Sequence, residues 1–334
     1  MTTQIAPAAL GGRGRGGGRR AGRTVTRGRA WLRALPLLPS VLLLLAFLAG
    51  PVVWSFYGAL TNASLTGPAA QSPDFVGLDN FVRLFTDPTF PKSLLLTVVF
   101  VIASAIIGQN VLGMWIAVLQ LRANRVVSAI TSTLVVAAWV LPEIVAGFIC
   151  YAYFSKDGTL NQILAGLGMT GPNWLYSYPM LAIILANIWR GTAFSMMIYQ
   201  AALNDVPPEI TEAAMIDGAG GSQRFFLVTL PMIRTSVSTN LMLITLQTLA
   251  AFTLIWVMTA GGPGDDSSTL PVLAYREAFQ FGDIGYGTAI AAVMIVIGAV
   301  FSVFYVALLR ERPAPKVAEG PGPRHPASER EVAS

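Results

Sequence analysis

The chain has 334 residues, of which 54% are hydrophobic and only 12% are charged, whereas about a quarter of residues are charged in soluble domains. Its single cysteine and single histidine exclude a disulfide framework, a cysteine metal site and catalysis built on imidazole. We therefore expect an all-α integral membrane protein without a metal or cofactor. The net charge of +5 does not by itself indicate a nucleic-acid partner, because the distribution of charge matters more.

The first segment, residues 1–34, is rich in glycine and arginine and has no acidic residue. Such a composition cannot bury apolar surface, so we expect a disordered tail. Its Arg-Gly repeats also allow an interpretation as an RNA-binding segment, but basic charge beside a membrane span is the ordinary explanation. A signal peptide is disfavoured, because the apolar run that follows has no polar end with a small-residue cleavage site.

Six apolar runs follow, and each reaches about the 20 residues needed to cross a bilayer as a helix. They are residues 35–60, 93–121, 127–154, 179–202, 237–260 and 288–310. Pro142 in the third run is tolerable as a kink. The runs predict a six-helix transmembrane domain over residues 35–310, followed by a second disordered tail, residues 311–334.

Lysine and arginine gather on one side of this predicted topology. That side holds the arginines of the first tail, several basic residues after Arg310, and Arg122, Arg125, Arg224 and Arg234. The other side holds only Arg83, Lys92, Lys156 and Arg276. We therefore expect a multi-pass protein of the cell membrane with both termini in the cytoplasm, together with the loop between the fourth and fifth runs.

That loop, residues 204–236, is a polar and glycine-punctuated segment between two apolar runs. Asn204 or Asp205 is placed to cap a helix whose first turn contains two prolines, and Gly218 is placed to end it. A second short helix would then end near Pro231. The segment must stay in water or meet a soluble partner.

The same segment resembles the EAA motif of ABC-importer permeases, which reads E-A-A, three residues, G, nine residues, I-x-L-P. Here the motif runs from Glu212 through Gly218 to Pro231, with Val228 in place of the isoleucine. The run Ile216–Ala219, IDGA, is similar to one common in the carbohydrate-uptake branch. The alternative is a helical hairpin that only joins two spans.

The resemblance implies an ABC-importer type I permease fold with six spans and a sugar or sugar-like substrate. It also implies a second permease subunit, a dimeric cytoplasmic ATPase into which the loop docks, and an extracytoplasmic substrate-binding protein. The chain has no G-x-x-x-x-G-K-[ST] phosphate loop, so ATP hydrolysis is expected in the partner and not in this chain. The residues implied in ATPase coupling are Glu209, Glu212, Ala213, Ala214, Asp217, Gly218, Phe225, Phe226 and Pro231.

Three loops on the opposite side also resemble segments of sugar permeases. They are FVGLDNF in residues 61–92, D-G-x-x-N-x-x-L in residues 155–178, and T-x-G-G-P in residues 259–270. Ordinary turn chemistry is the alternative, because Gly, Pro, Asp and Ser are turn residues in any protein. With the EAA-like motif, the resemblance covers about residues 35–310.

Charged side chains inside spans are rare and costly, so Glu143 and Arg190 stand out. They either line a polar translocation path or pair with each other, or with backbone carbonyls, and hold helices together. Among the other polar residues in spans, Asn187 and Gln247 can offer hydrogen bonds to substrate hydroxyls, and helix packing is the alternative. The substrate-path candidates are Glu143, Asn187, Arg190 and Gln247.

Two other classes of protein remain open from the residues alone. An ion-gradient-driven secondary transporter often carries paired intramembrane acids, whereas Glu143 is the only acid well inside a run. A membrane-embedded enzyme is disfavoured by the scarcity of His, Cys and clustered acids. Copurification of an ATPase subunit would separate the first interpretation from both of these.

Overall fold

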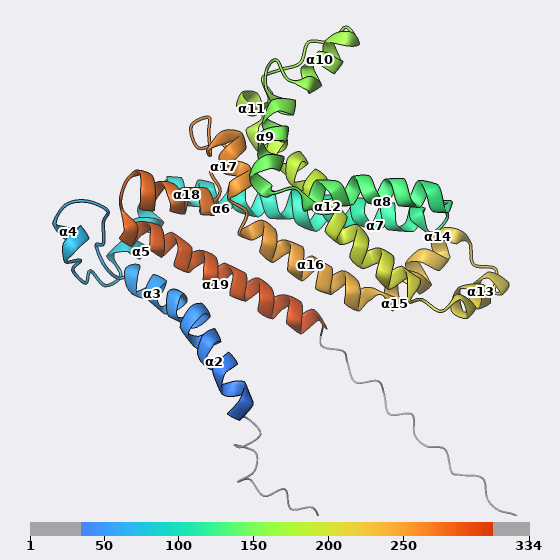
Figure 1. The fold of residues 1–334 in the computed structure, drawn as a ribbon, viewed down its shortest axis with the longest axis horizontal. Helices are drawn as coiled ribbons and strands as arrows, with labels where there is room; N and C mark the ends of the chain where they lie inside the picture. The colour runs from blue at the N-terminus through green and yellow to red at the C-terminus, as the bar shows by residue number, and fades with distance from the viewer. Residues whose placement is uncertain (1–34, 310–334) are drawn as a thin grey trace, which may run out of the picture. The chain divides into compact units, whose positions relative to one another are not determined.

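The computed structural model describes residues 35–309, which form helices and loops with one isolated antiparallel bridge between Thr61 and Phe75 (Figure 1). Its contacts divide the chain into two units, residues 1–53 and residues 54–334, and each is described by itself. The tails expected at residues 1–34 and 311–334 lie outside the described residues.

The described part of the first unit is helical from its first residue. It contains η1 (Leu35–Leu37), α2 (Leu38–Leu44) and the π-helix η2 (Leu45–Ala49), and the helix continues as α3 (Gly50–Gly58). The run Leu38–Gly58 is 21 residues long, and no residue of α2 or η2 is buried. Its length and composition suit a membrane crossing.

Three further helical runs are long and apolar enough to cross a membrane. The longest is Thr89–Gln120, 32 residues, made of α6 (Thr89–Phe100), the π-helix η3 (Val101–Gln109) and α7 (Asn110–Gln120). The others are α12 (Pro179–Asn204) and α19 (Ile284–Leu309). With Leu38–Gly58 they match four of the six predicted runs.

The third predicted run is not one straight helix. It is divided into α8 (Arg125–Val140) and α9 (Glu143–Phe154), and α9 leads on to α10 (Thr159–Gly166). The chain bends by 105° at this break. Pro142 supplies no N–H and restricts the residue before it to extended backbone, and Leu141 has φ −58° and ψ 136°. A proline expected to kink the span instead interrupts it.

The fifth predicted run is also interrupted, and the prediction of one helix there was wrong. α16 (Arg234–Leu249) ends before α17 (Thr253–Thr259), although residues 250–252 contain no proline or glycine. The Phe252 ring packs at 5.6 Å from Trp256 and 4.8 Å from Tyr275, centroid to centroid. Tertiary packing of this ring, which the local sequence does not reveal, accompanies the break.

α16 is joined at its start to the second half of the 204–236 segment. That half contains α14 (Gly221–Arg224), the π-helix η4 (Phe225–Thr229) and α15 (Leu230–Met232), and the chain bends by 71° between Met232 and Arg234. Counting by length and composition, the described residues hold four membrane-spanning candidates, or up to six if each bent pair is one span.

Short helices occupy the loops: α4 (Pro68–Gln71), α5 (Asp79–Thr86), α11 (Trp174–Ser177), α13 (Pro208–Ile216), α18 (Leu270–Tyr275) and the π-helix η5 (Arg276–Gln280). Within the second unit, α13 and α14 lie at one end of the α7, α12 and α16 group, whereas α5 and α18 lie at the other (Figure 1). The 121–125 loop, with its two arginines, lies at the α13–α14 end.

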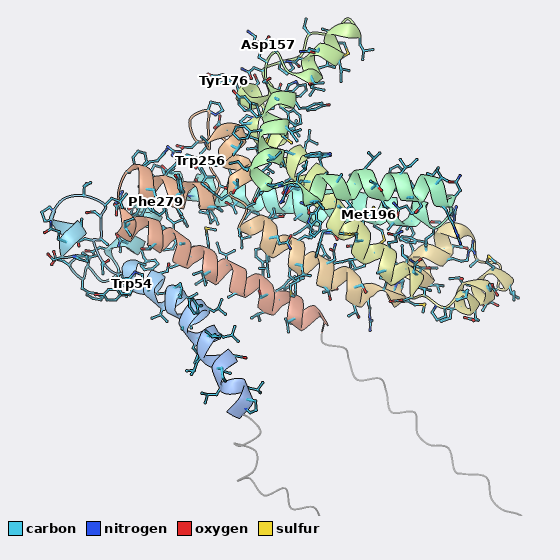
Figure 2. All side chains as sticks on the ribbon, viewed as in Figure 1. Trp54, Asp157, Tyr176, Met196, Trp256 and Phe279 are labelled. Atoms are coloured by element: carbon cyan, nitrogen blue, oxygen red, sulfur yellow. The ribbon has the colours of Figure 1, made fainter. Side chains whose placement is uncertain are left out.

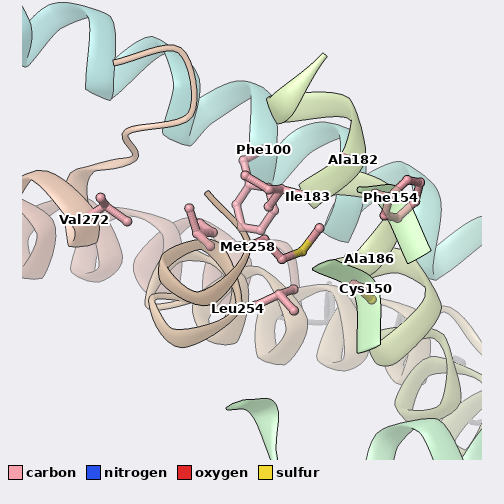
Figure 3. Close-up of a cluster of buried hydrophobic side chains, with 10 residues drawn as sticks. Phe100, Cys150, Phe154, Ala182, Ile183, Ala186, Leu254, Met258 and Val272 are labelled. Carbon is pink, nitrogen blue, oxygen red and sulfur yellow. The ribbon is translucent and has the colours of Figure 1, made fainter. Parts of the chain in front are cut away.

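Buried apolar side chains hold the second unit together in three clusters. The first joins α6, α9, α12 and α17 and includes Phe100, Cys150, Ile183 and Leu254 (Figure 3). Glycines allow the closest helix contacts. A Cβ added at Gly113 of α7 would lie 2.6 Å from Ser195 Cβ of α12, well inside contact distance.

Candidate functional site

The EAA-like motif begins on α13, which follows directly after Pro207 and has Pro208 and Glu209 in its first turn. The predicted caps were wrong: Asn204 is the last residue of α12, and no side chain caps α13. The apolar helix therefore continues further than its composition suggested. Pro208 still occupies a first-turn position where a missing N–H costs nothing.

Gly218 ends α13 in a Schellman motif, as its position predicted. The Ala219 nitrogen donates to the Ala214 carbonyl at 3.0 Å, and the Gly218 nitrogen donates to the Met215 carbonyl, also at 3.0 Å. Gly218 has φ +83°, a left-handed conformation that favours glycine. The motif satisfies carbonyls that the helix end would otherwise leave free, and it turns the chain toward α14.

The second half of the segment begins at a local cap. The Gly220 nitrogen donates to Gln223 Oε1 at 2.9 Å. The Phe225 and Phe226 rings then meet edge to face, with centroids 5.0 Å apart. Because Gly220 has extended backbone with φ −66°, Gly218 is the position of this turn that requires glycine.

No residue from α13 to α15 is buried. Of the nine predicted coupling residues, Ala214 and Phe225 are half-buried and the other seven are exposed. Several large apolar side chains of the same segment are also exposed: Ile210, Met215, Ile216, Phe226 and Leu227, with Ile216 at 87%. The predicted coupling residues did not include Ile210, Met215, Ile216 or Leu227, although apolar residues in a polar loop are a signal for a protein interface.

Both ends of this exposed segment are anchored in one buried cluster. It contains Ala117, Met196, Tyr199, Ala202, Leu203 and Ile233, from α7, from α12 and from the residue that precedes α16. Met196 lies among the long helices in Figure 2. A displacement of the segment would therefore be transmitted directly to α12 and α16.

A buried hydrogen-bond network reinforces this anchor. Asn240 Nδ2 on α16 lies 3.0 Å from each of three acceptors, Asn110 Oδ1, Ser195 Oγ and Tyr199 Oη. The Tyr199 hydroxyl also donates to Asn110 Oδ1. The network links α7, α12 and α16. Its four residues are isolated polar positions in the sequence, so only the tertiary structure reveals the network.

Arg122, after α7, lies beside the second half of the segment. A Cβ added at Gly221 would stand 3.8 Å from an Arg122 terminal nitrogen. The sequence assigned Arg122 only a topological role. The structure shows that the 121–125 loop and α14 are neighbours.

A second polar group lies in the interior of the long helices. Asn187 Nδ2 donates to Ser104 Oγ at 2.8 Å and to Thr248 Oγ1 at 3.5 Å, and Gln109 Nε2 donates to the Asn187 carbonyl at 3.1 Å. We call these four side chains the polar layer; all are buried and they join η3, α12 and α16. Asn187 would have to exchange these bonds to meet a substrate.

The other substrate-path candidates lie in more open positions. Gln247, beside Thr248 on α16, is exposed, and Glu143 and Arg190 are half-buried. Glu143 is in the first turn of α9, directly after the break at Pro142. No ion pair within 4.0 Å joins Glu143 and Arg190 among the described residues.

A pocket of about 500 Å³ lies between the α9–α11 arm and the end of α17 and is lined by polar and apolar residues, among them Tyr151, Asp157, Tyr176, Met258 and Thr259. Asp157 and Tyr176 stand on this arm in Figure 2. Within residues 35–309, no group of three or more His, Cys, Asp or Glu side chains could hold a metal ion.

The loops at the α5–α18 end carry an ionic cluster. Arg83 pairs with Asp283 and, at 3.8 Å, with Glu277. Burial raises the pKa of Glu277, and the attraction of Arg83 only partly opposes this. Burial also acts to raise the pKa of Asp87, but hydrogen bonds from Thr89 and Tyr286 and the charge of Arg83 together outweigh it, so the pKa is lowered.

Comparison with known proteins identifies the architecture. Residues 109–312 match the family described as "Binding-protein-dependent transport system inner membrane component". The sulfoquinovosyl glycerol transport system permease protein SmoG of Agrobacterium fabrum is 31% identical, over 84% of this chain and 91% of that protein. The trehalose/maltose transport system permease protein MalF of Thermococcus litoralis is 32% identical, over 85% of this chain and 95% of that protein.

A solved structure shares the fold. The chain superposes on a chain of a bacterial alginate ABC transporter, crystallised with an alginate-pentasaccharide-bound periplasmic protein, with a TM-score of 0.72. The match covers 85% of this chain and 95% of that chain at 22% identity. The predicted ABC permease resemblance is confirmed, and the secondary-transporter alternative is set aside. The chain belongs to the family of binding-protein-dependent transport system inner membrane components.

Proposed function

We propose that this chain forms part of the path for a sugar or sugar-like solute in an ATP-driven importer and takes its driving force through residues 204–236. The observation that carries the proposal is the exposed segment α13–α15, which ends one helix at Gly218 and is anchored at both ends in the bundle. ATP hydrolysis would reside in a partner, a dimeric cytoplasmic ATPase.

The topology we propose has six spans with both termini in the cytoplasm. It treats the bent pair α8–α10 as one span and takes α16 as the membrane part of the other bent pair, so that six spans are counted by length and composition while α14 and α15 stay outside the membrane. The gathering of Arg122, Arg125, Arg224 and Arg234 near one end of the bundle supports a cytoplasmic position for the 204–236 segment.

Docking into the ATPase would use both the polar and the apolar parts of the segment. Glu209, Glu212 and Asp217 would supply polar contacts at the rim, and Ala213, Ala214 and Gly218 would allow close approach of backbones. Phe226 and the neighbouring exposed apolar side chains would be buried, with Phe225 supporting them and Pro231 ending the contact surface. Such a mixture of apolar centre and polar rim is typical of protein interfaces.

Movement of the ATPase dimer would displace this segment as a unit. Because the buried cluster holds its ends to α12 and α16, and the Asn240 network joins these two helices, both helices would move with it. The cavity would then alternate between outward-facing and inward-facing states, whose populations ligands shift by binding one state better.

The sugar class comes from the relatives, whose names include trehalose, maltose and sulfoquinovosyl glycerol. For the path we propose Glu143, Asn187, Arg190 and Gln247, which lie on α9, α12 and α16. A second permease subunit would complete the cavity, and an extracytoplasmic substrate-binding protein would deliver the solute.

A cysteine-labelling experiment tests the sidedness on which the proposal depends. Cys150, the only cysteine, is replaced by serine, and single cysteines are placed at Ser222 and at Asp157, both of which are exposed. A membrane-impermeant maleimide added to intact cells should label Asp157→Cys but leave Ser222→Cys unlabelled until the cells are opened. Labelling of Ser222→Cys from outside would refute the docking role.

The docking itself is tested by copurification. A tagged chain should retain its ATPase subunit, and Ala213→Arg should release it without loss of the chain from the membrane. Ser302→Ala, a substitution on α19 and outside the segment, serves as the control. Equal retention of the ATPase by Ala213→Arg and by the control would count against the proposed interface.

A further inference from the structure

One charged side chain in the long helices has no partner within the described chain. Arg190 is the only Asp, Glu, Lys or Arg of α12. Among residues 35–309 no carboxylate lies within 4.0 Å of it, and its buried Nε has no hydrogen-bond partner. A guanidinium is always charged, so this group requires a counter-charge or water.

Its position along α12 excludes an easy route to the membrane surface. Arg190 is eleven residues from Pro179 and fourteen from Asn204, or about 17 and 21 Å at 1.5 Å per residue. An arginine near a helix end can extend its charge to the lipid headgroups, but these distances are longer than the side chain. A counter-charge or water must therefore reach Arg190 at mid-helix.

Other polar side chains lie near the level of Arg190 along α12. Asn187 of the polar layer is one turn away on α12, and a Cβ added at Gly191 would overlap the Gln109 side chain. Gln109 therefore reaches α12 at the residue next to Arg190. Trp189, on the other side of Arg190, is 42% exposed. Arg190 and two amides lie at this level of the helices, whereas Trp189 lines an apolar pocket with Tyr153, Phe154 and Leu185.

We infer that Arg190 recognises a negatively charged substituent of the transported solute: a carboxylate, sulfonate or phosphate on a sugar-like body. The inference rests on the proposed function, because it requires α12 to line the path. A guanidinium pairs with such groups through two parallel hydrogen bonds, which a neutral hydroxyl cannot match. The cargo of this transporter is then an acidic sugar derivative.

The surrounding groups favour a small solute over an acidic side chain of the second permease. A ligand site is typically an aromatic or apolar surface with a few convergent polar groups. A polyhydroxylated ring would use the amides of Gln109 and Asn187 beside the charge. An ion pair between subunits would need only the cation.

The test uses the complete transporter, with its second permease, ATPase and binding protein, in proteoliposomes. Uptake is measured for glucuronate, sulfoquinovose and glucose 6-phosphate, each against glucose as the neutral probe. The wild type should take up at least one anionic probe in preference to glucose. Uptake of no anionic probe, or preference for glucose over all three, overturns the inference.

Variants then separate Arg190 from the binding protein, whose selectivity is the same in every preparation. Arg190→Gln should lower the ratio of anionic to neutral uptake by about 10- to 100-fold, whereas Arg190→Lys, which keeps the charge but not the paired hydrogen bonds, should lower it less. Arg125→Gln, which removes an exposed arginine at the start of α8, is the matched control and should leave the ratio unchanged.

Two outcomes count against the inference. If Arg190→Gln lowers anionic and neutral uptake equally, Arg190 has a structural role. If Arg190→Gln loses the second permease on purification, the counter-charge belongs to that subunit. Copurification of the ATPase is scored in the same samples: its absence from the wild type refutes the proposed function, whereas its presence without charge preference refutes only this inference.

Discussion

Replacement of Gly218 by alanine isolates the contribution of one backbone angle to coupling. Gly218 has φ +83°, and no atom lies within 4 Å of the position that an added Cβ would occupy. The substitution therefore creates no clash and perturbs only the left-handed conformation. That conformation costs an L-residue about 1–2 kcal/mol, equivalent to a change of about 5- to 30-fold in an equilibrium constant.

We expect this cost to appear as lost coupling and not as lost folding. Because no residue of α13 to α15 is buried, the unfolding temperature of the purified chain should stay the same. The Schellman turn, however, would open, and uptake per ATP hydrolysed should fall by up to about 5- to 30-fold in proteoliposomes containing all subunits.

Two variants calibrate the measurement. Gly218→Asn should lose less, because asparagine tolerates the left-handed region better than alanine does. Gly220→Ala is the matched control: Gly220 has φ −66°, and apart from its adjacent residues the nearest atom to an added Cβ would be Gln223 Oε1 at 3.7 Å. If alanine at both positions lowers uptake equally, or if Gly218→Ala couples normally, the conformational argument is wrong.

Three further predictions concern stability, each measured as thermal unfolding of the purified chain in detergent. Gly113→Ala should lower stability by about 1–3 kcal/mol, because the added Cβ would force α7 and α12 apart; Gly298→Ala, whose nearest neighbour would be 3.7 Å away, should not. Asn240→Leu should cost about 1–2 kcal/mol, since it removes interhelical hydrogen bonds, and unchanged stability would show that the network contributes nothing. Burial raises the pKa of Glu277, so the folded chain holds this proton more tightly than the unfolded chain does. The resulting stability is fully present at a pH below 4.5, the ordinary pKa of the carboxyl, and it is lost as the pH rises through the pKa of the folded chain. Glu277→Gln should remove this pH dependence. A Glu277→Gln curve parallel to the wild type would contradict the assignment.

Local signals in the sequence carried much of the fold. Hydrophobic runs of sufficient length predicted the helices at 93–121, 179–202 and 288–310, because a helix in lipid satisfies its own backbone and needs only length and apolarity. Gly218 marked a helix end for an equally local reason, its freedom at positive φ. The EAA-like spacing placed the coupling segment, and family membership agrees with it.

Contacts between distant residues decided the rest. The break between Leu249 and Thr253 has no proline or glycine to announce it, and it lies where Phe252 packs on Tyr275 from a later helix. The Asn240 network joins residues up to 130 positions apart in the sequence. Glu143 and Arg190 have opposite charges, which suggested an ion pair, but they form none. Such features depend on which helices pack against each other, and that is decided only when the whole chain folds. Helix propensity, length and charge, in contrast, are properties of each segment by itself.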